Sequence, residues 1–264
     1  MMKTWQWWAL LSGALWVVSV LFLMPGDWRS KFEINKQLCG ASKTEPDLII
    51  GACTWLLYSD RLSEMGHAIS FTNRGNGFAR KGQYDQAIQD YDEALRLKPD
   101  YTLAYANRGY AYLIKDQYDR AIQDYDEALR LQPDYAKAYY NRGNAYQYKE
   151  QYDQAIRDYD KAIRLQPDYA MAYNGKAWLL ATASSAWVHD GRRAVTLAQQ
   201  AVRLHNHSGY IDTLAAAYAR AERFEAAVDA QERAIVKLQA EGGSEEAVAD
   251  FQSRLSLYRR GQAY

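Results

Sequence analysis

The chain has 264 residues, of which 48% are hydrophobic, so it is long enough and apolar enough to bury a substantial core. Its 32 basic and 32 acidic side chains cancel, which leaves no global field to attract nucleic acid or to press the protein onto anionic lipid. The composition therefore argues against a disordered chain and against a nucleic-acid-binding protein.

The first 28 residues contain an uncharged apolar segment. Trp5 to Met24 is a run of 20 residues without charge. As a helix, at about 1.5 Å per residue, such a run spans the ~30 Å hydrocarbon core of a bilayer. The segment ends in the sequence LMPG, which is a poor signal-peptidase site. We therefore predict a transmembrane anchor over residues 1–28, with a cleaved signal peptide as the main alternative and a buried soluble helix as the third.

Cys39 and Cys53 are the two cysteines of the chain. A bridge between them would close a loop of about 15 residues and contribute about 3 kcal/mol. We predict this disulfide, and the alternative is two unrelated buried thiols. The lysines and arginines that flank the anchor favour a cytoplasmic repeat domain, whereas a disulfide favours export. We follow the cysteines and expect the domain to lie outside the cytoplasm.

A 34-residue period organises most of the remaining chain. The stretch YDQAIQDYDEALRLKPD begins at Tyr84, and closely similar stretches begin at Tyr118 and Tyr152. The upstream halves, FTNRGNGF, YANRGYAY and YYNRGNAY, repeat in the same register. Apolar residues recur at helical spacing within each unit, and each unit stops at a proline, which cannot continue a helix. Each unit is therefore predicted to be a helical hairpin that is stabilised by stacking on its neighbours.

These residues resemble the tetratricopeptide repeat, whose pattern alternates bulky aromatic and small residues before a closing proline. In the second unit the pattern falls on Tyr105, Gly109, Tyr112, Ala121, Tyr125, Ala128 and Pro133. The small residues allow the paired helices to approach closely. The resemblance implies an all-α fold, a right-handed solenoid of helical hairpins, and a module that binds proteins and is not an enzyme.

The period divides the chain into an anchor, caps and repeats. Two later copies are degenerate, and the first of them has a longer internal loop in ATASSAWVHDG. Ser244 and two following acids predict a capped helix start. The predicted boundaries are 1–28 for the anchor, 29–67 for a Cys-containing linker and half-repeat cap, 68–101, 102–135 and 136–169 for full repeats, 170–207 and 208–241 for degenerate repeats, and 244–260 for a capping helix.

This arrangement resembles bacterial exported or membrane-anchored members of the superfamily. The resemblance implies a membrane-anchored protein, in a bacterial inner membrane, with the repeat domain in the periplasm or elsewhere outside the cytoplasm.

Motifs of known catalysis do not occur in the chain, which has no GxSxG, HExxH or phosphate-binding loop. We therefore predict no enzyme, no cofactor and no metal site. His205 and His207 are the one close histidine pair, and they lack a third ligand. One column of arginines, which includes Arg74, is matched by a column of aspartates on the partner helix. We predict ion pairs within each hairpin, and a basic ladder for an acidic ligand is the alternative.

In the family, the first helix of each hairpin lines a concave face that binds ligand. Transferring that pattern selects Asn73, Asn76, Asn107, Tyr110, Lys137, Tyr140, Asn141, Asn144 and Trp178 as the ligand groove. Chaperone-binding members grip a carboxylate with lysine, asparagine and arginine. Asn76, Asn107 and Lys137 match that clamp, but Thr72 and Asn141 stand where basic residues belong. The alternative for the asparagines is that Asn73, Asn107 and Asn141 only bridge neighbouring helices.

The sequence thus predicts a membrane-tethered scaffold that binds an extended peptide or a partner helix of another protein in its groove. Tyr110, Tyr140 and Trp178 are the expected aromatic anchors, because rings supply apolar area at low entropy cost. The competing hypothesis is a structural or assembly subunit of an envelope complex, which acts through its convex face or by self-association. The sequence does not identify the partner.

Overall fold

The computed structural model describes residues 28–59 and 61–264, and this part of the chain is helical. The described residues contain 13 α-helices, one short 3-10 helix and no strand. The helices fall into two compact units, Met1–Leu131 (unit 1) and Gln132–Tyr264 (unit 2). The all-α prediction is confirmed for the described residues.

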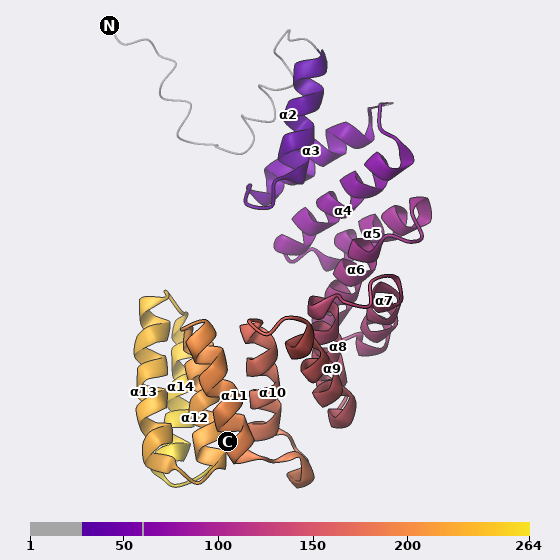
Figure 1. Ribbon diagram of the computed structural model, residues 1–264. Coiled ribbons are helices and arrows are strands. Elements are labelled where there is room, and N and C mark those ends of the chain that lie inside the picture. Colours follow the sequence, from indigo (N-terminus) through magenta and orange to yellow (C-terminus); the bar gives the residue numbers. More distant parts are fainter. Residues whose placement is uncertain (1–27, 60) are drawn as a thin grey trace, which may run out of the picture. The chain divides into compact units, whose positions relative to one another are not determined.

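Unit 1 contains six described helices (Figure 1). Helix α4 packs against α5 and α6 against α7, which makes two hairpins, and α5 also packs against α6. The first hairpin begins four residues ahead of the predicted boundary at 68, because the Ser63 hydroxyl caps α4 by accepting a hydrogen bond from the Gly66 amide at 3.1 Å. The bounds are α2 (Trp28–Gly40), α3 (Pro46–Leu57), α4 (Glu64–Arg80), α5 (Tyr84–Leu97), α6 (Thr102–Ile114) and α7 (Tyr118–Leu131).

Unit 2 continues the same alternation of paired helices. Helix α8 packs against α9, α10 against α11 and α12 against α13, and α14 closes the series by packing on α13 (Figure 1). The bounds are α8 (Ala136–Tyr148), α9 (Tyr152–Leu165), α10 (Ala170–Thr182), η1 (Ala186–Val188), α11 (Gly191–Leu204), α12 (Ser208–Arg220), α13 (Phe224–Ala240) and α14 (Glu245–Arg259). The longer internal loop predicted in the fourth repeat contains η1.

Small residues and tyrosines interlock inside each hairpin. A side-chain carbon added to Gly75 would lie 2.7 Å from the Tyr91 ring, and one added to Gly143 would lie 2.9 Å from the Tyr159 ring. Both tyrosines are buried, so neither ring has room to retreat. The glycine column thus lets the paired helices approach closely, as predicted, and the space beside each glycine is filled by a tyrosine ring of the partner helix.

The turn inside each regular hairpin contains one residue with a left-handed backbone. This residue is Gly82 in the first hairpin, with φ 74°, but it is Asp116 and Glu150 in the next two, each with φ 56°. Glu222, with φ 59°, holds the same place between α12 and α13. Glycine adopts this conformation freely, whereas other residues adopt it at a cost.

The first two helices of the described chain are joined covalently. The sulfur atoms of Cys39 in α2 and Cys53 in α3 form a disulfide, with Cα atoms 4.9 Å apart. Residues predicted as a linker are therefore helical in α2, because Phe32 and Cys39 pack against α3. Trp28 of α2 stacks on Trp55 of α3 with ring centroids 5.7 Å apart.

The predicted anchor, Trp5–Met24, lies outside the described residues. In the ranges that the structure describes, no helix is both long and apolar enough to cross a bilayer.

Helix α14 begins as its sequence predicts. The Ser244 hydroxyl accepts a hydrogen bond from the Ala247 amide at 3.2 Å, and two glutamates occupy the first turn. The buried side of the helix carries Phe251, Leu255 and Tyr258.

Candidate functional site

The two helices of each hairpin present different chemistry to solvent. Helix α6 has 13 residues and a single charged one, Arg108. Its partner α7 has 14 residues and six charged ones. Helix α6 thus exposes apolar and amide groups, while α7 exposes charge.

In the first three hairpins, one arginine of the first helix pairs with an aspartate of the second helix of the same hairpin. Arg74 donates two hydrogen bonds to Asp90, at 2.8 and 2.7 Å. The same paired contact joins Arg108 to Asp124 and, in unit 2, joins Arg142 to Asp158. The predicted ion pairs within the hairpins are confirmed. Arg108 also reaches back 2.5 Å to Asp92 of the preceding hairpin, so one guanidinium joins three helices.

Lys176 ends this basic column and is fully buried in α10. In its own hairpin, Leu197 replaces the expected aspartate, so the lysine pairs with Asp160 of the preceding hairpin at 2.5 Å. Burial lowers the pKa of Lys176 from its ordinary value, and the hydrogen bond with Asp160 opposes that effect.

Several asparagines of the predicted groove are used by the fold itself. Asn76 accepts one hydrogen bond from the Tyr91 hydroxyl at 2.8 Å and another from the Asn107 amide at 2.9 Å. Asn144 accepts one from the Tyr159 hydroxyl at 2.7 Å. Of the three asparagines in the alternative interpretation, Asn107 bridges two helices in this way, and Asn76 and Asn144 also bond across helices. They leave fewer amide groups for a ligand than the sequence suggests.

The remaining groove residues differ in how far they reach solvent. Asn73 is partly exposed, Lys137 is exposed and Asn141 is buried. Tyr140 is partly buried and packs its ring against Tyr169, with centroids 5.4 Å apart. Tyr140 is therefore committed largely to the packing of unit 2.

Unit 1 exposes an apolar stripe on the first helix of each hairpin, α4 and α6. Leu103, Tyr110 and Ile114 of α6 are 46, 43 and 44% exposed, and with Asn107 they are spaced so that they share one side of the helix. Met65 and Ile69 are exposed on α4, on the same side as Asn76. The Asn76–Asn107 hydrogen bond joins the two sides. We call Met65, Ile69, Leu103, Tyr110 and Ile114 the unit 1 stripe.

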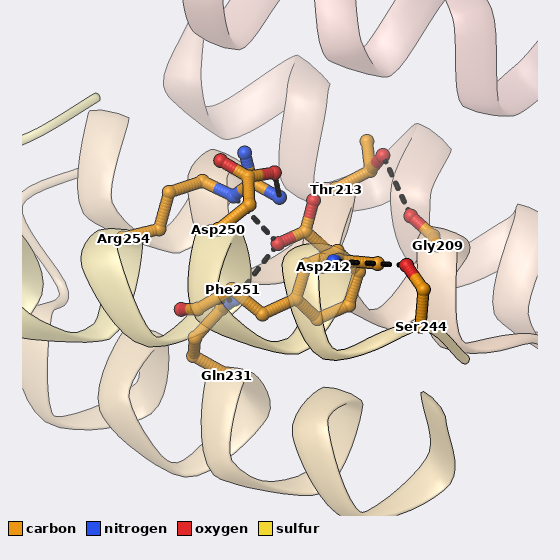
Figure 2. Close-up of polar contacts among 9 residues, drawn as sticks. Gly209, Asp212, Thr213, Gln231, Ser244, Asp250, Phe251 and Arg254 are labelled. Carbon is orange, nitrogen blue, oxygen red and sulfur yellow. Dashed lines mark hydrogen bonds and ion pairs between the residues drawn. The ribbon is translucent and has the colours of Figure 1, made fainter. Parts of the chain in front are cut away.

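Unit 2 contains a buried polar network that sequence reasoning missed. Figure 2 shows Gln231 of α13 and Arg254 of α14 converging on Asp212 of α12, at 2.8 and 2.9 Å. Arg254 also pairs with Asp250 at 2.8 Å. Burial raises the pKa of Asp212, against the opposing effects of Arg254 and Gln231. A lone aspartate in the otherwise apolar middle of α12 was the available signal.

Trp178, the last residue of the predicted groove, lies beside this network. Its ring is 5.9 Å from the Arg254 guanidinium carbon, and it also lies beside the ring of Tyr264, with centroids 5.7 Å apart. Elsewhere in unit 2, the rings of His205 and His207 are 6.0 Å apart. In the described ranges, no group of three or more histidine, cysteine or acidic side chains is placed to hold a metal.

Sequence comparison agrees with this repeating geometry. The family described as "Tetratricopeptide repeat" matches residues 136–169, and the family described as "TPR repeat" matches residues 75–116 and 109–149. The chain is a tetratricopeptide-repeat protein. A search of curated proteins gave no match.

Two solved tetratricopeptide-repeat structures, TTC0263 and YrrB, share the fold of this chain. TTC0263, a thermophilic TPR protein in Thermus thermophilus, is 18% identical with a TM-score of 0.58, over 72% of this chain and 98% of that one. YrrB, described as a TPR protein with an unusual peptide-binding site, is 21% identical with a TM-score of 0.53, over 76% and 98%. The second TPR domain of human RPAP3, solved with an HSP70 peptide, is 32% identical with a TM-score of 0.42, over 43% and 94%.

Proposed function

We propose that this tetratricopeptide-repeat protein is a non-enzymatic scaffold that binds an extended segment or a helix of another protein on its first helices. The observation that carries the proposal is the unit 1 stripe, where large apolar side chains are exposed side by side on α6 with no free charge among them. Monomeric proteins bury most such side chains, and contiguous exposed ones mark sites of interaction. YrrB, which has this fold, is described as having a peptide-binding site, and a peptide ligand here would be of the same kind.

The chemistry of the stripe suggests how a ligand would be held. Leu103 and Ile114 offer aliphatic surface at either end, and Tyr110 offers a ring and a hydroxyl between them. Binding would come mainly from apolar burial, because Arg108, the charged residue of α6, is already paired with two aspartates. We therefore expect binding to weaken little with added salt, unlike a charge-steered contact.

A crosslinking experiment tests the proposal and its structural alternative together. A photoreactive amino acid is placed at Tyr110, on the stripe, or at Gln123, an exposed position on α7. We expect partner adducts from position 110 that disappear when Leu103 and Ile114 are changed to serine, with helix content unchanged by circular dichroism. Adducts from position 123 that survive those changes would instead favour an assembly subunit that acts through its second helices.

We further propose that Trp5–Met24 tethers the scaffold to a bacterial inner membrane, with the repeats outside the cytoplasm. The Cys39–Cys53 disulfide supports export, because disulfides persist in oxidising compartments. The expected result is that alkaline carbonate leaves the protein in the membrane fraction and that a periplasm-dependent reporter fused after Tyr264 is active. A soluble product that starts near Gly26 would replace the anchor with a signal peptide, and a silent reporter would reverse the orientation.

A further inference from the structure

Tyr264 lies against side chains from three different helices of unit 2. Its ring centroid is 5.7 Å from that of Trp178 in α10, and the guanidinium carbon of Arg254 in α14 is 5.4 Å from the same Tyr264 ring. Arg220, at the end of α12, donates a hydrogen bond to the main-chain oxygen of Tyr264 at 3.0 Å. We call Trp178, Arg220 and Arg254 the aromatic site.

The fold holds these three side chains in place independently of Tyr264. Arg254 is fixed by the two carboxylates that it pairs with in the buried network. Arg220 donates a second hydrogen bond, from Nε, to the Ala181 carbonyl oxygen at 2.7 Å. Trp178 packs against the apolar core of unit 2. The site is therefore preformed, and emptying it would not require rearrangement of its walls.

Tyr264 itself is held much more loosely than the residues around it. Its side chain is 50% exposed. The segment leaves α14 through Gln262, whose N–H donates to the Leu257 carbonyl oxygen at 3.0 Å, and residues 262–264 have no helical structure. The contacts that oppose the replacement of Tyr264 are those with Trp178, Arg220 and Arg254, which a similar ring from another molecule could remake, and the packing of Ala263 against the apolar core of unit 2.

We propose that the aromatic site binds an aromatic side chain from an extended segment of a partner protein, and that Tyr264 occupies the site until such a segment displaces it. The guanidinium of Arg254 and the ring of Trp178 both favour contact with a flat aromatic group, such as the ring that Tyr264 now supplies. Arg220 offers a donor that the backbone carbonyl of any extended peptide can satisfy. The ligand class is thus a peptide with tyrosine, tryptophan or phenylalanine, chosen by its ring and not by its charge.

The inference rests on the proposed function in one respect: it assumes that the protein binds peptides, and it places a second peptide site at Trp178 on α10, the first helix of its hairpin. It differs in location, since the site lies wholly in unit 2, and it adds regulation. A tethered competitor has a high effective concentration, so the site would respond only to segments that bind well or are themselves brought close.

The test uses the amidated tetrapeptide GQAY, the sequence of residues 261–264, with a fluorescein label. Its affinity is measured by fluorescence anisotropy for the full chain and for the Tyr264→Ala chain. We expect the Tyr264→Ala chain to bind about tenfold more tightly or better, because the internal competitor is gone. The peptide GQAA should bind the same chain about tenfold more weakly, because the ring is the main contact.

A matched pair of variants in the Tyr264→Ala chain locates the binding. Trp178→Leu should reduce peptide affinity about tenfold with helix content retained, and Tyr110→Ser in unit 1 should leave it unchanged. Equal affinity of the unchanged and Tyr264→Ala chains, or an unchanged affinity in Trp178→Leu, would overturn the inference. Neither result bears on the unit 1 stripe, whose failure would show only in the crosslinking experiment.

Discussion

The first helices of unit 1 and the last helices of unit 2 are secured by different chemistry. In unit 1 a disulfide ties α2 to α3, and α2 contributes few apolar side chains. In unit 2 a buried network ties α12, α13 and α14 through Asp212, Gln231 and Arg254, beside a full apolar stripe on α14. Helices in such a stack are stabilised mainly by the surfaces that they share with their neighbours. Helix α2, which offers little apolar surface, is thus held to its neighbour by a covalent bond. Helix α14, which offers more, is held by apolar packing and a buried polar network.

The largest expected effect comes from breaking the network in unit 2. Arg254→Ala leaves the buried Asp212 without its cation, and removing one partner of a buried ion pair costs about 3–5 kcal/mol. We expect urea unfolding, followed by circular dichroism, to show an early transition for unit 2. Arg259→Ala, on the same helix but in an exposed pair with Glu232, should cost less than about 1 kcal/mol. Equal losses in the two variants would contradict the role given to the network.

Reduction of the disulfide should have the next largest effect. The bridge spans a sequence separation of 14, and opening a loop of that size costs about 3 kcal/mol. We expect dithiothreitol to lower the denaturation midpoint of unit 1 and to leave unit 2 unchanged, because coupling in a stack is mainly between neighbours. The chain with Cys39→Ser and Cys53→Ser, whose unfolding should not respond to the reductant, is the control. Free thiols in protein taken from its native compartment would count against both the bridge and export.

The smallest effect compares two aromatic residues at equivalent repeat positions. Tyr110 and Trp178 are separated by 68 residues, two periods of the repeat. Tyr110→Ala should change the free energy of unfolding by no more than about 0.5 kcal/mol, because Tyr110 is 43% exposed and lies outside the apolar core of the described part of unit 1. Trp178→Ala should cost about 2 kcal/mol, because its ring packs on the core of unit 2 and beneath Tyr264. Thermal unfolding of both variants measures the two costs. A similar loss of stability in each would mean that the packing of Trp178 against the core and Tyr264 contributes little to stability.

Features that repeat were predictable from the sequence. The period, the pairing of glycine with tyrosine and the Arg74–Asp90 contact all follow from residues at fixed spacing, because every copy reports the same geometry. Ser244 could be identified as a cap because capping is a local interaction within one turn.

Features that occur once were not predictable in the same way. Helix α2 depends on a surface provided by α3, and the burial of Arg254 depends on Asp212, which is 42 residues away in sequence. Asn76 illustrates the same limit within the candidate site. Its residue type suggests a ligand contact, but its oxygen is occupied by Tyr91 and Asn107 only once three helices are assembled. The contact of Tyr264 with Trp178 likewise has no signature in either local sequence.

The left-handed turn residues have a consequence for the history and engineering of the repeat. Asp116, Glu150 and Glu222 keep a backbone conformation that suits glycine, and each bears a cost of the order of 1 kcal/mol or more. Gly82 shows that the fold accepts the relaxed residue at that place. Replacing these three residues by glycine should therefore raise the stability of the fold, and, in the described part of the chain, none of the three turns takes part in the packing of glycine against tyrosine. These turns are places where the protein can be made more robust, or can absorb a harmful mutation elsewhere, without touching either binding surface.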